Sequence, residues 1–383
     1  MTHAARPAAP PLVRSTVPGW DDLAHAASPF TVGVLPGEGA GPEVVGAALT
    51  VLDAVAETFG LEFRLEVADD LGAPGPFGPV LQPPVAEFFE ACLGTGAPVL
   101  CGAVGGRFVY DVRARFDLFC KFVPVRPRPE LADASILRSE RVHGVDVLVV
   151  RDNVGGIYQG AYGRRDGGRV AYQEAVYDVG GVDRLLEVAV RAASARDGRL
   201  AVVTKSGGIP EVSALWRERA AVVSADSGVA VEEVEVDNAC YQLVADPARF
   251  DVVATPNLLG DVVADTAALV LGSRGLALSA NFGAPGHAVY QTGHGAARDL
   301  AGRDCANPVA QIESAAMMLR ESFDLVDAAD VVEAAVTDVL AAGFRTPDIA
   351  GPGSTVVGTR ALATLVAEAV PVAAQRADVG QVR

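Results

Sequence analysis

Short apolar runs alternate with longer amphipathic segments along most of this chain. The runs are rich in Val, Leu and Ala, which is typical of strands that a sheet buries on both faces. Between them, apolar residues recur every three or four positions, as on one face of a helix. This alternation predicts an α/β architecture. Strands are expected at 30–35, 61–67, 98–101, 145–150, 200–203, 230–236 and 250–255, and helices at 42–59, 85–93, 182–193, from about 261, 309–323, 328–342 and 358–370.

Composition narrows the class of protein. Half of the 383 residues are hydrophobic, so the chain can build a large core and is long enough for two domains. A formal net charge of −17 argues against nucleic acid and anionic membranes as partners. The sequence contains no apolar run that could span a bilayer and its start lacks a signal peptide, so we expect a cytoplasmic protein.

Two further features concern order and cysteine chemistry. Residues 1–27 are rich in Pro and Ala without a clear period, and we expect them to form a disordered tail. The five cysteines are scattered without C-x-x-C spacing, so we expect small buried hydrophobic residues and not disulfides or zinc ligands.

Two aspartates stand out in the stretch Asn-Leu-Leu-Gly-Asp-Val-Val-Ala-Asp that begins at Asn257. In a helix, Asp261 and Asp265 project from one face within reach of a common ligand. The apolar residues around them indicate a mostly buried helix, where two like charges would repel. The pair is therefore either a solvated helix face or part of a site for Mg²⁺ or Mn²⁺, which prefer oxygen ligands.

Basic residues gather locally in this acidic chain. Arg107, Arg113 and Lys121 lie close together in sequence, and Arg151 ends the predicted strand 145–150. Arginine offers bidentate hydrogen bonds to carboxylates, so these residues predict an anion pocket, although arginines also serve solubility at a surface. Lys205 likewise follows a predicted strand, where a lone lysine is either solvated or catalytic.

The turn at residues 36–43 is rich in glycine and joins a predicted strand to a predicted helix. The Rossmann dinucleotide fingerprint requires a glycine where Pro42 stands, so the turn does not match it. Its amides face either a ligand or solvent.

With these pieces assembled, the chain resembles the metal-dependent β-decarboxylating dehydrogenases, the isopropylmalate and isocitrate dehydrogenase family. The resemblance implies a two-domain α/β fold with a large mixed sheet flanked by helices, which is not a Rossmann fold. The matching segments run in family order from about residue 30 to 370 and cover 35–44, 113–119, 150–158, Lys205 with 211–218, 237–243, 257–283 and 290–320.

The resemblance also implies roles for individual residues. Asp261 and Asp265 match the metal-binding aspartates, and Asp237 matches a third that comes from the partner subunit. Lys205 matches the lysine that assists removal of the hydroxyl proton, and Tyr158 matches the tyrosine that protonates the enolate. Arg113 and Arg151 match arginines that bind substrate carboxylates.

The cofactor loop by resemblance is residues 294–302, with His294 and Gly295 at its start. Asp299 stands where NAD-using members resemble one another in carrying an aspartate, which accepts hydrogen bonds from ribose hydroxyls and repels a 2′-phosphate. We therefore expect NAD. Asn307 matches a residue near the adenine.

Three departures affect the expected substrate. Val123 stands where the family usually has an arginine, and Lys121, on the same face of a strand, is expected to supply that charge. Gly207 replaces an asparagine of the family. The loop before Arg113 lacks both the paired leucines of isopropylmalate enzymes and the Ser/Asn pair of isocitrate enzymes, and offers Arg107 and Tyr110 to the substrate.

These features predict a homodimer with shared active sites that uses NAD and Mg²⁺ or Mn²⁺ on a 2-hydroxy acid with a 3-carboxylate. A 3-isopropylmalate-like substrate is expected first, then isocitrate, homoisocitrate, tartrate, malate or a phosphono-analogue. A catalytically weak regulatory subunit is the alternative class. Residues 28–118 with 272–383 are expected to form the cofactor-binding domain, and 119–271 the second domain with the dimer interface.

Overall fold

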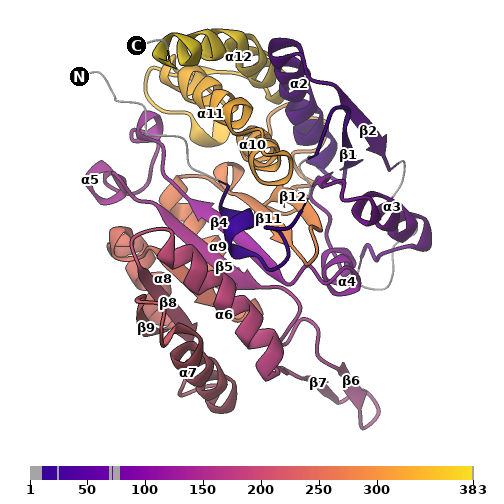
Figure 1. Ribbon diagram of the computed structural model, residues 1–383, viewed down its shortest axis with the longest axis vertical. Helices are drawn as coiled ribbons and strands as arrows, with labels where there is room; N and C mark the ends of the chain where they lie inside the picture. Colours follow the sequence, from indigo (N-terminus) through magenta and orange to yellow (C-terminus); the bar gives the residue numbers. More distant parts are fainter. Residues whose placement is uncertain (1–10, 24–25, 69–70, 72–77, 382–383) are drawn as a thin grey trace.

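One mixed sheet of ten strands runs through the molecule, with helices packed along it (Figure 1). The computed structural model describes residues 11–23, 26–68, 71 and 78–381. The predicted α/β class and large mixed sheet are confirmed. In spatial order the strands are β2 (Phe63–Val67), β1 (Phe30–Leu35), β3 (Val99–Cys101), β12 (Ala288–Thr292), β11 (Leu278–Phe282), β4 (Cys120–Val125), β5 (Val147–Asp152), β10 (Val252–Thr255), β8 (Arg199–Thr204) and β9 (Ala230–Glu235).

Antiparallel pairing in the middle of the sheet separates this fold from a Rossmann fold. Strands β4 and β11 pair antiparallel with each other and with their outer neighbours, whereas β5, β10, β8 and β9 are mutually parallel. The carboxyl ends of parallel strands meet at one edge of a sheet. The segments that follow these four strands, which carry most of the predicted site residues, therefore share that edge.

The helices begin and end where local chemistry predicts. Pro42 lies in the first turn of α2, which ends at Gly60 in the left-handed conformation, and the Asp178 side chain caps α6. The helices are α1 (Leu12–Thr16), α2 (Gly41–Phe59), α3 (Pro83–Gly94), α4 (Phe108–Arg115), α5 (Ser139–Val142), α6 (Val179–Ser194), α7 (Pro210–Ser224), α8 (Val236–Ala245), α9 (Asn257–Leu271), α10 (Val309–Phe323), α11 (Val326–Ala341) and α12 (Thr359–Gln381).

The last helix extends well past the predicted end at residue 370. Val370 and Ala373 are buried, and α12 packs against α2 and α11, so tertiary contacts continue the helix through Pro371. Outside the large sheet, two short strand pairs form, β6 (Tyr162–Arg165) with β7 (Val170–Gln173) and β13 (Phe344–Arg345) with β14 (Thr355–Val356). The β6–β7 hairpin extends away from the body of the molecule (Figure 1).

The prediction of a disordered tail is wrong for residues 11–23. Val13, Val17 and Trp20 are almost completely buried, and the Trp20 ring meets Phe282 edge to face. The indole N–H donates to the carbonyl of Gly283 at 2.8 Å. Three apolar side chains fix this short segment, although its composition carries no helical period. Residues 1–10 and 24–25 lie outside the described part of the chain.

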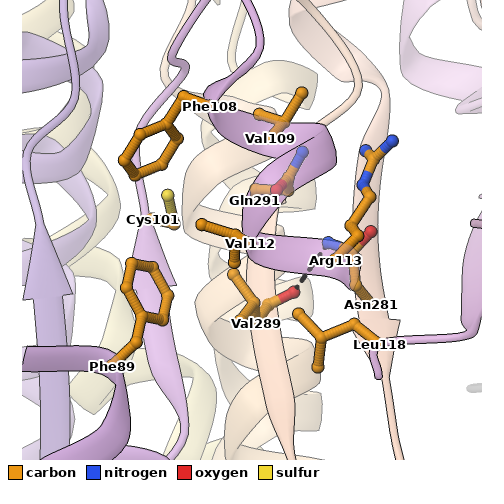
Figure 2. A pocket seen from close by; sticks show the side chains of 10 residues that line it. All are labelled: Phe89, Cys101, Phe108, Val109, Val112, Arg113, Leu118, Asn281, Val289 and Gln291. Atoms are coloured by element: carbon orange, nitrogen blue, oxygen red, sulfur yellow. Dashed lines mark hydrogen bonds between the residues drawn. The ribbon is translucent and has the colours of Figure 1, made fainter. Parts of the chain in front are cut away.

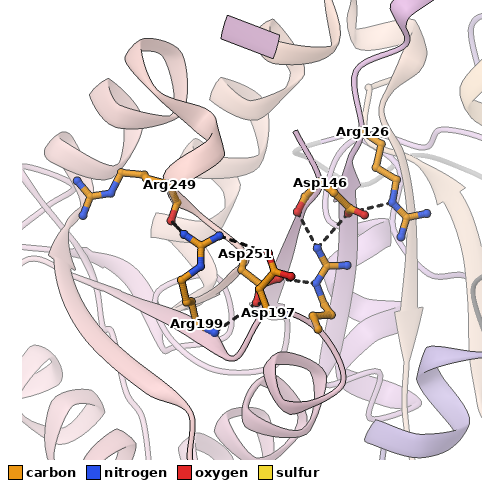
Figure 3. Close-up of polar contacts among 7 residues, drawn as sticks. Arg126, Asp146, Asp197, Arg199, Arg249 and Asp251 are labelled. Carbon is orange, nitrogen blue, oxygen red and sulfur yellow. Dashed lines mark hydrogen bonds and ion pairs between the residues drawn. The ribbon is translucent and has the colours of Figure 1, made fainter. Parts of the chain in front are cut away.

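An ionic network ties together the opposite edge of the sheet, at the amino ends of β5, β8 and β10 (Figure 3). Asp146 accepts from Arg126 and Arg196, each at 3.0 Å, and Arg196 also donates to Asp251 at 2.7 Å. Burial opposes ionisation of Asp146, but Arg126 and Arg196 outweigh it and lower its pKa to about 2. The network therefore stays ionised near neutral pH.

All five cysteines are free. Cys92, Cys101 and Cys120 are buried as predicted, whereas Cys240 and Cys305 are only half-buried. Within the described residues, none of the helices has the length and apolar character needed to cross a membrane.

Candidate active site

A row of polar side chains crosses the middle of the sheet on one face. Register places Lys121 of β4 opposite Arg151 of β5 on one side and opposite Asn281 of β11 on the other. Paired residues of neighbouring strands project to the same face. All three side chains are buried, so this face of the sheet holds two buried cations side by side.

Helix α9 lies directly on this row. A side chain at Gly260 would begin 2.7 Å from the Arg151 side chain, so only glycine allows the helix this close. The carboxylate of the next residue, Asp261, accepts from the Arg151 guanidinium and, at 2.9 Å, from the Tyr158 hydroxyl. Burial opposes ionisation of Asp261, but Arg151 and Tyr158 outweigh it and lower its pKa. Burial and the charge of Asp261 together raise the pKa of Tyr158.

A third buried cation, Arg113, completes the cluster with Lys121 and Arg151. Arg113 of α4 and Lys121 are each about 5% exposed, and neither side chain makes a hydrogen bond or ion pair within the described residues. Burial and the neighbouring charge of Arg151 lower the pKa of Arg113 to about 10. Burial, Arg113 and Arg151 also lower the pKa of Lys121 well below its usual value. With Asp261 as the nearest counter-charge, this cluster is short of negative charge.

The predicted metal-binding pair has the expected spacing. Asp261 and Asp265 occupy successive turns of α9, and their side chains are 42% and 52% exposed, so both carboxylates can still take a ligand. Asp265 forms an ion pair with Arg274 at 2.9 Å. The described residues contain no cluster of three acidic, His or Cys side chains able to hold a metal. The donor chemistry fits a divalent cation, but this chain alone brings two of the three predicted ligands together.

The third predicted ligand lies with the predicted catalytic lysine. Asp237 on α8 accepts from Lys205 at 2.8 Å, and Glu235 pairs with the same lysine at 3.1 Å. These hydrogen bonds raise the pKa of Lys205 and lower that of Asp237. Asp237 is 71% exposed, and Asp261 and Asp265 are not among its partners. Within the described residues, the three predicted metal ligands therefore do not form one cluster.

The residues that replace the family's leucines pack around Tyr158. The Tyr110 ring lies 4.8 Å from the Tyr158 ring, and the guanidinium groups of Arg107 and Arg113 lie over Tyr110. Arg107 donates to the carbonyl of Tyr158 at 2.9 Å and approaches Asp111 at 3.6 Å. Helix α4 therefore contacts the tyrosine directly.

A small cavity lies beneath α4 (Figure 2). Its walls are mainly apolar, including Phe89, Phe108 and Val112, and the Arg113 guanidinium extends away from Phe89. Asn281 reaches the cavity and donates to the carbonyl of Val289 at 3.2 Å. Arg113 is the one charged residue among those that line the cavity, and the mainly apolar remainder packs against α4.

The predicted cofactor loop packs onto the start of α2. Ala40 donates to the carbonyl of Ala296 at 2.8 Å, and Arg298 pairs with Glu38, also at 2.8 Å. His294 has its ring Nδ1 2.8 Å from the carbonyl of Gly295, and burial lowers its pKa. The side chain of Asp299 is exposed at the loop surface and available to a ligand.

Asn307 lies at the base of this loop. It is buried, and its side chain accepts from Val309 at 3.0 Å and donates to Asp348 at 3.1 Å. Gly275 packs against it so closely that a side chain there would clash. Exposed Asp299 and buried Asn307 provide a polar platform whose chemistry fits the ribose and base of a nucleotide.

The departures from the family have clear structural settings. Val123 is buried in β4 on the same face as Lys121, so Lys121 is the cation that this strand offers there. At Gly207, a side chain would meet nothing within 4 Å, so the turn after Lys205 is open where the family carries asparagine.

Sequence reasoning missed three polar residues near the site. Asn281 is a buried asparagine inside an apolar strand, which is itself a signal of function. Asn257 was visible as the first residue of the aspartate stretch. Tyr177, which contacts the segment before Tyr158, carried no local signal.

Comparison with known proteins gives consistent matches along the chain. Residues 31–366 match the family model described as isocitrate/isopropylmalate dehydrogenase. The 3-isopropylmalate dehydrogenase of Oleidesulfovibrio alaskensis is 41% identical over 356 residues, covering 88% of this chain and 98% of the relative. That of Synechocystis is 39% identical over 357 residues, covering 86% and 95%. A crystal structure of isocitrate dehydrogenase from Methylococcus capsulatus has a TM-score of 0.78 at 27% identity, covering 89% and 99%.

Proposed function

Because this chain belongs to the isocitrate/isopropylmalate dehydrogenase family, we propose that it oxidises a 2-hydroxy acid bearing a 3-carboxylate and releases carbon dioxide, with NAD and Mg²⁺ or Mn²⁺ as cofactors. A 3-isopropylmalate-like acid is the first-choice substrate, because the curated relatives above carry that name. The reaction takes place in the cytoplasm.

The observation that carries this proposal is the uncompensated cationic cluster. Arg113 and Lys121 are buried without a hydrogen-bond or ion-pair partner in the described residues, next to Arg151. Burying unpaired charge is costly, so a protein keeps such a cluster where a ligand neutralises it. A substrate with two carboxylates has the matching charge. Lys121 takes the charge of the family's arginine, although it cannot form a bidentate clamp.

The residues divide the chemistry between them. Asp261, Asp265 and a partner's aspartate would hold the divalent cation, which would supply Lewis-acid stabilisation of the developing oxyanion. The loop at 294–302 would hold NAD, which would supply the hydride acceptor. Lys205 assists removal of the hydroxyl proton, and Tyr158 delivers a proton to the enolate carbon after decarboxylation. Like an ordinary tyrosine, Tyr158 is protonated near neutral pH, as a proton donor must be, and its hydrogen bond to Asp261 fixes where the hydroxyl points.

A dimer with shared sites is supported by an exposed apolar stripe next to the aspartates. Leu258, Val262 and Leu269 of α9 are 37–49% exposed, and Asp265 lies in the same stripe. Tyr241 on the neighbouring α8 is 68% exposed. Apolar faces of this kind mark interfaces. A second copy covering α8 and α9 would bring its own Asp237 and Lys205 toward this pair.

The group that the substrate carries at C3, beside the 3-carboxylate, would lie against α4. Arg107 and Tyr110 stand there in place of aliphatic residues, so isocitrate, homoisocitrate, tartrate, malate and a phosphono-analogue stay in the substrate set. A 3-substituent with polar or anionic character would suit these side chains better than a bare isopropyl group.

The proposal is tested by incubating the protein with NAD, Mn²⁺ and a panel of 3-substituted malates while NADH is followed spectroscopically. We expect NADH with at least one acid, loss of activity on chelation of Mn²⁺, and a much lower rate with NADP. Nucleotide or metal binding without turnover of any acid would contradict the enzymatic proposal and favour a regulatory subunit.

A further inference from the structure

Tyr177 lies between the β6–β7 hairpin and α6, and it contacts two site-bearing segments. Its hydroxyl oxygen accepts from the backbone N–H of Asn257 at 2.9 Å, which satisfies one of the free N–H groups in the first turn of α9. Its ring meets Trp216 edge to face at 5.7 Å, and Trp216 is fully buried. The tyrosine is therefore fixed on one side by the core and reaches the start of α9 on the other.

The second segment is the glycine turn that precedes Tyr158. A side chain on Gly155 would begin 2.6 Å from the Tyr177 ring, and one on Gly156 would begin 2.2 Å from its hydroxyl. Gly156 also has a φ of +71°, which side chains disfavour. The turn can lie against Tyr177 because both residues are glycine, and it leads directly to Tyr158.

Asn257 links the two segments to the cationic cluster. It is completely buried, and its side-chain amide donates to the carbonyl of Gly155 at 3.0 Å. Its side-chain oxygen accepts from the Arg151 guanidinium at 2.9 Å. Asn257 thus joins the glycine turn, the end of β5 and the first turn of α9. Asp261 lies one turn further along that helix.

We propose that Tyr177, acting through Asn257, is a positioning residue that sets the Tyr158 hydroxyl against Asp261. The reaction it serves rests on the proposed function, but the linkage itself does not. The hydroxyl of Tyr177 carries the role, because it holds the N–H of Asn257, while the ring also fills space against Trp216 and the two glycines. A residue that merely packs the core would not need the hydroxyl.

The Tyr177→Phe variant separates these two roles, since it keeps the ring and removes the hydroxyl. We expect kcat to fall about 10-fold, because sub-ångström misplacement of a reacting group is costly. The solvent deuterium isotope effect on kcat should rise as proton delivery by Tyr158 becomes limiting, with only a small fall in Tm. Tyr172→Phe is the matched control, because Tyr172 lies on the exposed hairpin. Loss of its hydroxyl should change neither kcat nor the isotope effect.

Amide hydrogen exchange gives a readout that does not depend on turnover. In Tyr177→Phe, peptides covering residues 153–158 and 257–261 should exchange faster, whereas the rest of the protein and the Tyr172→Phe control should not. Wild-type exchange in both peptides would overturn the linkage. An unchanged kcat and isotope effect, with or without a lower Tm, would overturn the positioning role. Absence of turnover by the wild-type protein would instead count against the proposed function, and exchange alone would then decide the linkage.

Discussion

Lys121 is a buried cation with no hydrogen bond or ion pair among the described residues, between Arg151 and Asn281 in the sheet. Burial of an unpaired charge lowers the stability of a fold, so Lys121 is explained by what it binds and not by what it stabilises. Removing it should therefore affect activity and stability in opposite directions.

We predict that Lys121→Met lowers kcat/KM for the best acid of the panel by about 10- to 100-fold, the value of one charge-assisted hydrogen bond. The same change should raise the unfolding free energy, because a methionine of similar length avoids the buried charge. Steady-state kinetics and urea denaturation measure the two effects. Arg115→Met is the control, because Arg115 pairs with Glu90 at the surface. A Lys121 variant with normal kcat/KM would exclude this residue from the substrate site.

At the residue scale, much of the site was predictable because charged residues directly follow apolar strands. Arg151 and Lys205 were found in this way, and the two aspartates of α9 by their four-residue spacing on one helix face. The connection of Arg151 to Asp261 was not, because it depends on how closely α9 approaches β5 over Gly260. Tyr177 was missed for the same reason: its partner Asn257 is 80 residues away in sequence.

At the scale of elements, periodicity predicted β1 and α10 at their observed bounds and several other elements within a few residues. It gave no strand at β11 or β12 and no helix at α4, α7 or α8. It failed at the amino-terminal segment, which precedes the family match that starts at residue 31. The amino-terminal segment connects two helices that are far apart in the sequence, since α1 packs on both α6 and α10. Its order comes from docked side chains, and a five-residue helix is too short to produce a period.

We predict that Trp20→Ala lowers the unfolding free energy by about 3–5 kcal/mol, as expected for loss of a fully buried large aromatic. Chemical denaturation of the full-length protein provides the measurement. Val222→Ala, on the exposed side of α7, should change the free energy little. A Trp20 variant as stable as the control would mean that the segment is only loosely attached.

The same segment predicts a pH effect through Glu321 of α10, which accepts from the N–H groups of Leu12 and Val13. Burial outweighs these hydrogen bonds and raises the pKa of Glu321 from 4.5 to about 7. The folded state then retains a proton that the unfolded state has lost, so this group's contribution to stability declines as the pH rises from 4.5 to about 7.

In Glu321→Gln this decline should disappear, removing up to about 3 kcal/mol of pH-dependent change in the unfolding free energy over that range. Urea denaturation at several pH values, compared with the wild type, measures it. Superimposable pH profiles for the two proteins would show that Glu321 ionises normally.

At the scale of the whole molecule, the fold class was predictable and the assembly remains a proposal. The alternation of strands and helices indicated α/β, and the resemblance supplied the mixed sheet, which β4 and β11 create by running antiparallel at its centre. The sheet is continuous across the predicted boundaries at residues 118 and 271, so the two-domain division remains a prediction. Composition could not reveal that Asp237 and the pair on α9 form no single ligand cluster among the described residues.

A shared site predicts complementation between inactive variants. Asp237→Asn and Asp265→Asn should each lose metal-dependent activity, yet mixed dimers should contain one intact site. Random exchange of subunits should then restore about a quarter of wild-type activity. Native mass spectrometry verifies that mixed dimers form. If the mixed dimers remain inactive, the metal site is not shared between two subunits.

We propose above all that oxidation and decarboxylation are coupled at one metal-dependent site. The most direct test measures NADH and carbon dioxide released from the best acid of the panel with Mn²⁺, for the wild type and for Asp261→Asn. We expect equimolar release by the wild type and at least about 100-fold slower release of both by the variant. Release of NADH without carbon dioxide, or full activity in Asp261→Asn, would contradict this coupling.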